Sequence, residues 1–362
     1  MPARSALIDR RSFVKAAGSL FLAALSAPAA FALERADAVY ATGIRTPDGR
    51  FALALMGEDG AFISRIALPD RIHGLTVSPA TGAVAAFARR PGTFVLVLAP
   101  SGTETIINAI PDRHFYGHGA FSPDGRFLYA SENDFENRRG VIGIYDARQN
   151  YIRIGEYPTY GIGPHDLSVT PDGRFLVAAN GGIETHPDFG RTKLNLDHME
   201  PSLALIDAAT GALVEKHALP AALSQLSTRH LALGAEGRIW FACQFEGPRN
   251  ETPPLVGHVT VGEGLSFTPL PEEVTIGLGN YVGAIASNPR DGLIGLTSPK
   301  GLVVTLEEAT GRVVATNMLE NAAGIADAAH GFAVGTYDGL FAGARHDAAF
   351  DQHAVRLTGN PV

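Results

Sequence analysis

Residues 163–207, with the sequence GPHDLSVTPDGRFLVAANGGIETHPDFGRTKLNLDHMEPSLALID, carry a pattern that recurs along the chain. LSVT and RFLVAAN have the alternation and β-branched content of paired strands, and Pro-Asp-Gly-Arg lies between them. Asp-Gly is a strong turn signal because Gly adopts positive φ at little cost and Asp bonds to its own backbone. Thr210 and Gly211 mark a second turn before a further strand, so four strands fit between His165 and Leu219. The stretch predicts one propeller blade that contains a long insertion.

Similar units recur at a spacing of about 40–50 residues, which is typical of four-stranded propeller blades. The first opens at Pro47, the seventh begins near Ala322, and those between cover residues 72–111, 115–158, 163–220, 227–271 and 278–320. We predict an all-β fold, a seven-bladed β-propeller with four antiparallel strands per blade, as one domain over residues 33–362. A parallel β-helix is the alternative, although its repeats are shorter. We expect no helix of any length. The strand around Val355 either pairs with the segment around Val39 to close the ring or finishes a blade of its own.

The composition and charge limit the classes of partner. Of the 362 residues, 46% are hydrophobic, and the net charge is −8. Residues 1–32 hold four basic residues and one acid, so the net charge of residues 33–362 is −11. This charge argues against nucleic acid or anionic lipid as a partner, because both need basic patches. The single cysteine, Cys243, excludes an intramolecular disulfide, and its apolar surroundings in the sequence favour a buried thiol.

The N-terminus has the form of an export signal. The segment DRRSFVK is followed by an Ala-rich apolar run, and Ala-Phe-Ala at residues 30–32 resembles a cleavage site. The twin arginines followed by Ser-Phe-Val-Lys resemble the Tat consensus, with an ordinary Sec signal as the alternative. Residues 1–32 are therefore predicted to be a Tat signal peptide, and the mature chain is predicted to be periplasmic. No later segment approaches the ~18 consecutive apolar residues of a membrane span.

Histidines recur at one position of the repeats, at the start of the predicted first strand. His73, His118, His165 and His230 each lie five or six residues before the turn that follows this strand. Because the first strands of a propeller line the central channel and start at the same rim, these side chains are expected to converge. Neutral imidazoles suit iron, copper, nickel and zinc. Alternatively, these histidines cap strand starts, and the change from five to six residues would point neighbouring rings to opposite faces.

Further polar residues adjoin these histidines or follow the second strands, at the rim that the histidines share. They are candidate ligand-binding residues of the rim; the acids among them, beside the histidines, would suit a metal or a cationic ligand, or else these residues cap turns. The candidates are Glu132, Asn133, Asp134, Asp166, Asn180, Arg229 and Gln244, and the insertion adds His186, Asp188, His198 and Glu200. Of these, His186 joins the four histidines as a candidate metal ligand. No metalloprotease, phosphate-loop or nucleophile-elbow motif is present.

Four segments together resemble one family of propellers: ENDFENRRGVIGIYD, the stretch quoted above, LSTRHLALGAEGRIWFACQ and GNYVGAIA. The family is the Tat-exported bacterial propellers of domain-of-unknown-function family 1513, and the resemblance covers nearly the whole mature chain. It implies a seven-bladed periplasmic fold of YVTN- or WD-repeat type. Members are commonly encoded beside imelysin-type iron-transport lipoproteins and a dihaem oxidoreductase, which implies these partners and a part in iron uptake. Iron or copper is the metal to expect.

The matching blocks carry over candidate residues without roles, because the family has no established reaction. These residues are Glu132, Asn133, Asp134, His165, Asn180, His186, Arg191, Lys193, Asn195, Arg229, His230, Gln244 and Tyr281. His73 and His118 rest on their position in the repeat alone.

Three classes of function remain open. We favour a binding protein that holds a metal or a protein partner at one rim of the channel, as an accessory of metal acquisition. The second class is a lactonase-like hydrolase, in which Glu132, His118, His165 and Arg229 would serve as base, ligands and oxyanion partner. The third is a propeller that only scaffolds other proteins. A quinone-cofactor dehydrogenase is disfavoured, since such propellers carry repeated tryptophans and this chain has only Trp240.

Overall fold

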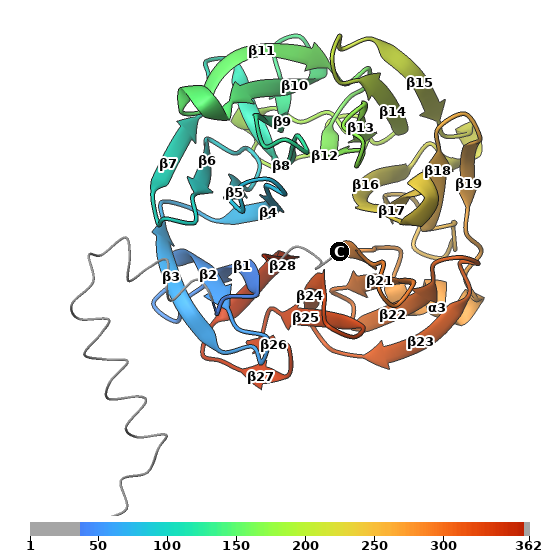
Figure 1. Cartoon of the computed structure of the whole chain (residues 1–362). Coiled ribbons are helices and arrows are strands. Elements are labelled where there is room, and N and C mark those ends of the chain that lie inside the picture. The colour runs from blue at the N-terminus through green and yellow to red at the C-terminus, as the bar shows by residue number, and fades with distance from the viewer. Residues whose placement is uncertain (1–36, 358–362) are drawn as a thin grey trace, which may run out of the picture.

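A computed structural model describes residues 37–357 as a seven-bladed β-propeller around a central channel (Figure 1). Each blade is a sheet of four antiparallel strands. The predicted signal peptide, residues 1–32, lies outside the described residues. Within residues 37–357, no helix is both long enough and apolar enough to cross a membrane. The all-β, seven-bladed, four-stranded prediction is therefore confirmed for the described part of the chain.

The strands follow the predicted units closely, and the innermost strand of each blade comes first below. The first blade holds β28 (Ala349–Arg356), β1 (Tyr40–Arg45), β2 (Phe51–Met56) and β3 (Phe62–Leu68); the second holds β4 (Ile72–Val77), β5 (Val84–Ala88), β6 (Phe94–Leu98) and β7 (Glu104–Asn108). The third holds β8 (Arg113–Phe121), β9 (Phe127–Asp134), β10 (Arg139–Asp146) and β11 (Ile152–Pro158); the fourth holds β12 (Pro164–Val169), β13 (Phe175–Asn180), β14 (Ser202–Asp207) and β15 (Leu213–Ala218).

The last three blades continue the same order around the ring. The fifth holds β16 (Leu226–Leu233), β17 (Ile239–Phe245), β18 (Val256–Thr260) and β19 (Gly264–Phe267). The sixth holds β20 (Ala284–Asn288), β21 (Leu293–Ser298), β22 (Leu302–Glu307) and β23 (Val313–Met318), and the seventh holds β24 (Ala322–Asp327), β25 (Phe332–Thr336), β26 (Leu340–Phe341) and β27 (Ala344–Arg345).

The repeated Asp-Gly turns show the predicted features: the Asp side chain accepts hydrogen bonds within the turn, and the Gly has a positive φ. Between β12 and β13, Asp172 accepts hydrogen bonds from the Thr170 hydroxyl at 2.6 Å and the Arg174 amide at 3.1 Å. Gly173 adopts a φ of +73°, which a residue with a Cβ rarely takes. The turn fixes the register of the two strands, and with it the position of the residues that begin β12 at the channel.

The ring is closed by strands from both ends of the chain. β28 pairs antiparallel with β1, with Arg356 opposite Tyr40 and Val355 opposite Ala41. Figure 1 shows this red strand beside the blue strands of the same blade. Of the two arrangements that the sequence allowed, the structure has the one in which the C-terminal strand closes the ring. This strand lines the channel and contributes side chains to its centre.

The expectation that the chain contains no helix is wrong. A seven-residue helix, α3 (Glu272–Leu278), connects the fifth and sixth blades. Glu272 and Glu273 stand in its first turn, where acids interact favourably with the helix dipole, and Gly279 ends it in the left-handed conformation. These start and stop signals are present in the sequence, but the strand repeat had assigned Leu278 to the sixth blade.

Apolar side chains fill the spaces between neighbouring blades. The largest buried cluster joins the fourth, fifth and sixth blades and includes Trp240, Phe241 and Cys243, each at most 1% exposed. Burial raises the pKa of the Cys243 thiol, so this cysteine is a core residue, as predicted. The packed interfaces hold the innermost strands rigidly around the channel.

Candidate metal centre in the central channel

Five histidines from five different blades meet inside the channel. They are His73 on β4, His118 on β8, His165 on β12, His230 on β16 and His353 on β28. The ring centres of His73 and His118 lie 4.8 Å apart, and those of His230 and His353 also lie 4.8 Å apart. The structure thus brings together the four histidines predicted from their repeat position. We call these five residues the channel histidines.

Irregularities in the innermost strands explain how residues five and six positions before a turn reach the same space. The pairing register shifts between Ile72 and Leu75 in β4, between Phe115 and Gly119 in β8, and between Pro164 and Asp166 in β12. Similar shifts interrupt β16 and β28 at the same level. A bulge inserts a residue and changes the direction of the side chains around it. Residues five and six positions before a turn therefore need not point to opposite faces of these strands, and their rings can converge.

The channel histidines offer ligand atoms that the protein itself does not use. His73 Nδ1, His118 Nε2, His353 Nε2 and both ring nitrogens of His230 are buried without a hydrogen-bond partner. Desolvation holds the pKa of all five rings below the usual histidine range, and that of His118 at about 3. The rings are therefore neutral near pH 7, which is the form that ligates metals. Unpartnered buried polar atoms are costly, so their clustering makes these histidines a candidate ligand site.

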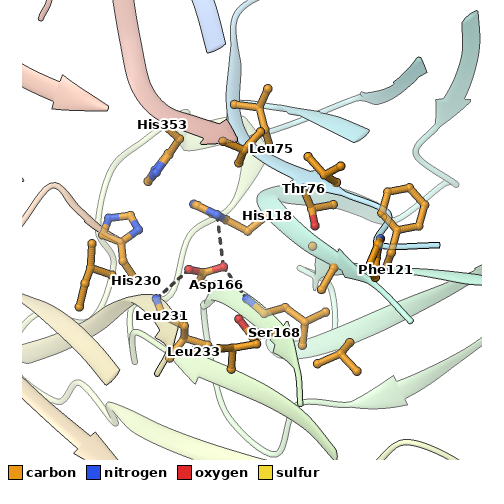
Figure 2. A pocket seen from close by; sticks show the side chains of 18 of the residues that line it. Leu75, Thr76, His118, Phe121, Asp166, Ser168, His230, Leu231, Leu233 and His353 are labelled. Atoms are coloured by element: carbon orange, nitrogen blue, oxygen red, sulfur yellow. Dashed lines mark hydrogen bonds and ion pairs between the residues drawn. The ribbon is translucent and has the colours of Figure 1, made fainter. Parts of the chain in front are cut away.

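Two sets of three histidines are close enough to be candidate ligand sets for a metal ion. In the set His73, His118 and His165, and in the set His118, His230 and His353, the ligand atoms all lie within 4.8 Å of one another. His118 belongs to both. Figure 2 shows His118, His230 and His353 around one space, with Asp166 beside them. The arrangement fits first-row transition metals, which favour neutral imidazole.

Asp166 holds His118 in position. Its carboxylate lies 3.3 Å from His118 Nδ1 and accepts hydrogen bonds from the backbone amides of Leu167 at 2.7 Å and Leu231 at 2.9 Å (Figure 2). Burial raises the pKa of Asp166 to about 7. A carboxylate on the far nitrogen of a ligating histidine fixes the ring and raises its basicity. Asp166 is thus placed to orient a ligand, whereas the sequence had it binding at the rim.

The channel histidines separate two cavities of different character. Downstream along the innermost strands, a cavity of about 530 Å³ reaches His118, His230 and His353 and is otherwise lined mainly by apolar residues such as Leu75 and Leu167. Toward the starts of the same strands, a cavity of about 240 Å³ reaches His73 and His165. We call this smaller cavity the basic pocket. Its other lining residues are Arg89, Arg90, Tyr116, Arg191, Lys193, Arg229, Gln244, Tyr281 and Gln352.

Four of the predicted rim residues thus line the basic pocket: Arg191, Arg229, Gln244 and Tyr281. Arg229 lies near the histidines, with Nη1 3.5 Å from His165 Nδ1. Tyr281 meets Gln244 in an isolated β-bridge and bonds to the side-chain amide of Gln352. Arg191 comes from the insertion between β13 and β14, which extends over the neighbouring blades.

Other predicted residues have structural partners away from the channel histidines. Glu132, only 1% exposed, accepts hydrogen bonds from Arg153 at 3.0 Å and the Tyr145 hydroxyl at 2.6 Å. Asp134 pairs with Arg113 at 2.8 Å and Arg139 at 2.6 Å. These two carboxylates therefore belong to ion pairs within the third blade. The assignment of Glu132 as a catalytic base does not fit this environment.

The two asparagines hold loops to the blades. Asn133 donates to the backbone carbonyl of Thr185 at 2.9 Å and contacts His114 Nε2 at 3.0 Å. Asn180 donates to the backbone carbonyl of Thr159 at 2.9 Å. Their partners are backbone and neighbouring side chains, so these residues position the insertion and the interblade loop.

His186, the fifth predicted metal ligand, does not join the channel histidines. Its ring lies in the insertion, 5.0 Å from that of Phe135, with Asp188 at 3.6 Å and Glu136 at 3.9 Å. The insertion lacks the repeat position that brings the other histidines into the channel. His186 is therefore near the candidate site in sequence but not in space.

The sequence reasoning missed His353, Arg89 and Arg90. His353 precedes Ala-Val-Arg-Leu-Thr-Gly, which resembles the strand that follows His73, so the repeat signal was available once the C-terminal strand was placed innermost. Arg89 and Arg90 follow the second strand of their blade, the same position as the predicted rim residues. Nothing in their residue type had marked them as interior.

The fold and the site define a class: a seven-bladed propeller whose channel is crossed by a histidine cluster with a basic pocket on one side. The chain belongs to the family described as protein of unknown function DUF1513, which matches residues 66–357. A segment of 60 residues, 16% of this chain, is 40% identical to 17% of a 6-phosphogluconolactonase from Formosa agariphila.

Solved structures share the architecture at low identity. Hydrazine synthase of Kuenenia stuttgartiensis superposes with a TM-score of 0.59 at 16% identity, over 80% of this chain and 86% of that one. A chain of the nidogen/laminin complex gives a TM-score of 0.55 at 11% identity, over 88% of this chain and 98% of that one. At such identities these likenesses concern the propeller fold alone.

Proposed function

We propose that this protein is a periplasmic metal-binding propeller that holds one first-row transition-metal ion, iron or copper, between the channel histidines. In this role it serves metal acquisition, with the imelysin-type lipoproteins and the dihaem oxidoreductase as proposed partners. The observation that carries the proposal is the convergence of five neutral imidazoles, four of which have buried nitrogens without a hydrogen-bond partner.

The ligand geometry favours a single ion. Both sets of three histidines contain His118, and Asp166 faces its Nδ1 at 3.3 Å. Only Nε2 of His118 is then free to ligate, and one nitrogen serves one ion. A metal on either set excludes a second metal on the other. We therefore expect a stoichiometry of one ion per chain.

The test is elemental analysis of the protein purified from the periplasm after native export, without chelator. We expect near-stoichiometric iron or copper, lost in the His165→Gln/His230→Gln double variant. The matched control is His186→Gln/His198→Gln in the insertion, which should retain the metal. Protein that is metal-free and also fails to bind added iron and copper would overturn the proposal.

A lactonase-like hydrolase is the second candidate, favoured by the short match to a 6-phosphogluconolactonase. Since Glu132 is buried in the third blade, the base would instead be Asp166, whose raised pKa of about 7 suits proton transfer near neutral pH. A metal-polarised ester carbonyl would be attacked by water. Turnover of 6-phosphogluconolactone that is lost in Asp166→Asn would support this function, and no turnover in a lactone panel would exclude it.

A further inference from the structure

The basic pocket carries more positive charge than the chain around it neutralises. Five cationic side chains line it, and no carboxylate is among its lining residues. Glu246 is shared by Arg229, at 3.1 Å, and by Lys193, which it also contacts. Two of the five cations are thus matched by one acid.

The remaining three, Arg89, Arg90 and Arg191, have no carboxylate partner within residues 37–357. The Nε atoms of Arg89 and Arg90 are buried without a hydrogen-bond partner. Asp351, which lies near Arg89, already accepts two hydrogen bonds of 2.7 Å from Arg71. Arg90 is only 8% exposed, so water does not replace the missing anion for it.

The like charges also act on one another. The guanidinium of Arg191 is partly desolvated although the residue is exposed, and this desolvation together with the nearby Arg89, Arg90 and Arg229 lowers the pKa of Arg191 to about 10. Gathering guanidinium groups in one place without acids is unfavourable unless a ligand of opposite charge joins them. The planar guanidinium fork matches the oxygens of carboxylates and phosphates.

We propose that the basic pocket binds a small oxyanion with two or more negative charges, a di- or tricarboxylate or a phosphate. Arg89, Arg90 and Arg191 pair with its oxygens. The size agrees, because a cavity of about 240 Å³ admits a molecule smaller than the drug-sized ligands of larger pockets.

The pocket also places the anion beside the metal centre. His73 and His165 line the pocket and belong to one of the two histidine sets. An oxyanion held by the arginines therefore lies next to the ion of the proposed function, and this adjacency rests on that function. The binding of the anion itself rests on the arginines alone.

The test is calorimetric titration of the purified, metal-free chain with citrate, inorganic phosphate and acetate at constant ionic strength. We expect saturable 1:1 binding of citrate or phosphate and at least tenfold weaker binding of acetate, because one charge satisfies fewer arginines. Tighter citrate identifies a polycarboxylate as the ligand class, and tighter phosphate identifies a phosphate.

Variants locate the site. Arg89→Met and Arg191→Met should each weaken binding at least tenfold, and Arg191 is exposed at the mouth of the pocket, so its replacement leaves the fold intact. Arg148→Met, on the exposed turn after β10, is the matched control and should bind normally. Binding unchanged in both pocket variants, or no binding of citrate and phosphate at millimolar concentration, overturns the proposal.

The outcome is separable from that of the metal test. The His118→Gln/His230→Gln variant, which replaces no residue that lines the basic pocket, should lose metal and still bind the anion in its metal-free form. Anion binding in a protein that holds no metal would sink the proposed function and leave the anion site standing. Metal binding without anion affinity would support the proposed function and overturn the anion site.

Discussion

The third blade and the centre of the propeller treat their polar groups in opposite ways. In the third blade, three arginines and three acids form one connected network with N–O distances of 2.6–3.4 Å: Arg113, Arg139, Arg153, Glu132, Asp134 and Glu156. In the basic pocket, three arginines have no acid among the described residues. The charges of the first arrangement are balanced within the protein, and those of the second are not.

The histidines show the same contrast. His114, in the third blade, has both ring nitrogens bonded, Nδ1 to the Phe115 carbonyl at 3.1 Å and Nε2 to Asn133 at 3.0 Å. Among the channel histidines, His118 lies only four residues after His114 and the others lie on other blades. Four of these five residues have buried ring nitrogens without a hydrogen-bond partner. Burial and polarity alone therefore do not mark a site; unsatisfied burial does.

Breaking the complete network should have the largest effect on stability. Glu132→Ala removes the buried carboxylate that binds Arg153 and Tyr145, and leaves Arg153 paired with Glu156 alone. We expect the free energy of unfolding to fall by about 3–5 kcal/mol. Urea unfolding measures this, with the exposed Glu136→Ala as control. Metal and anion affinities of the folded variant should be unchanged; a loss below 1 kcal/mol would show that the network is not structural.

Loosening the support of the metal centre should have an intermediate effect. Asp166→Asn weakens the contact that fixes His118, so metal affinity should fall about 10- to 100-fold. Competition with a chelator of known affinity measures the change. Asp172→Asn, in the exposed turn after β12, is the matched control. Equal affinities in the two variants would remove Asp166 from the metal centre.

The third-blade histidine gives a pH dependence of known sign. Burial lowers the pKa of His114 to about 4, so between pH 4 and 6.5 the unfolded state binds more protons at this residue than the folded state. The stability contributed by neutral His114 is present above pH 6.5 and is lost as the pH falls toward 4. Relative to His114→Gln, the wild type should lose about 1.4 kcal/mol more per pH unit in this window. Unfolding free energies at several pH values test this, with the exposed His330→Gln as control; parallel curves would contradict it.

Removing an unmatched charge should have the smallest effect, and in the opposite direction. Arg90→Met takes away a buried guanidinium that has no acid partner, although it also loses the contact with the Tyr116 ring at 5.6 Å. Without a ligand, we expect the free energy of unfolding to be unchanged or raised by up to about 1 kcal/mol. Urea unfolding in anion-free buffer measures it. A loss comparable to that of Glu132→Ala would mean that Arg90 is structural.

The sequence alone determined the fold, because the fold repeats. Turns ending in Gly, several of them Asp-Gly, recur once per unit of about 40–50 residues, and each sets the register of the strands beside it, so seven blades could be counted without coordinates. The same repeat placed His73, His118, His165 and His230 on innermost strands. The helix α3 was missed because it occurs once, in a link between blades.

Only the tertiary structure decided which polar residues are satisfied. Glu132 and Asp134 lie at the end of a second strand, and Arg89 and Arg90 directly follow one. The partners of the two acids nevertheless come from other strands of the sheet, which no local pattern specifies. His353 entered the site because the C-terminal strand closes the ring beside Tyr40, about 300 residues earlier in the chain. The bulges that turn the five imidazoles toward one another are likewise set by pairing between strands. Local sequence determined which residues occupy each position, and contacts between distant segments decided which of their polar groups find partners within the protein.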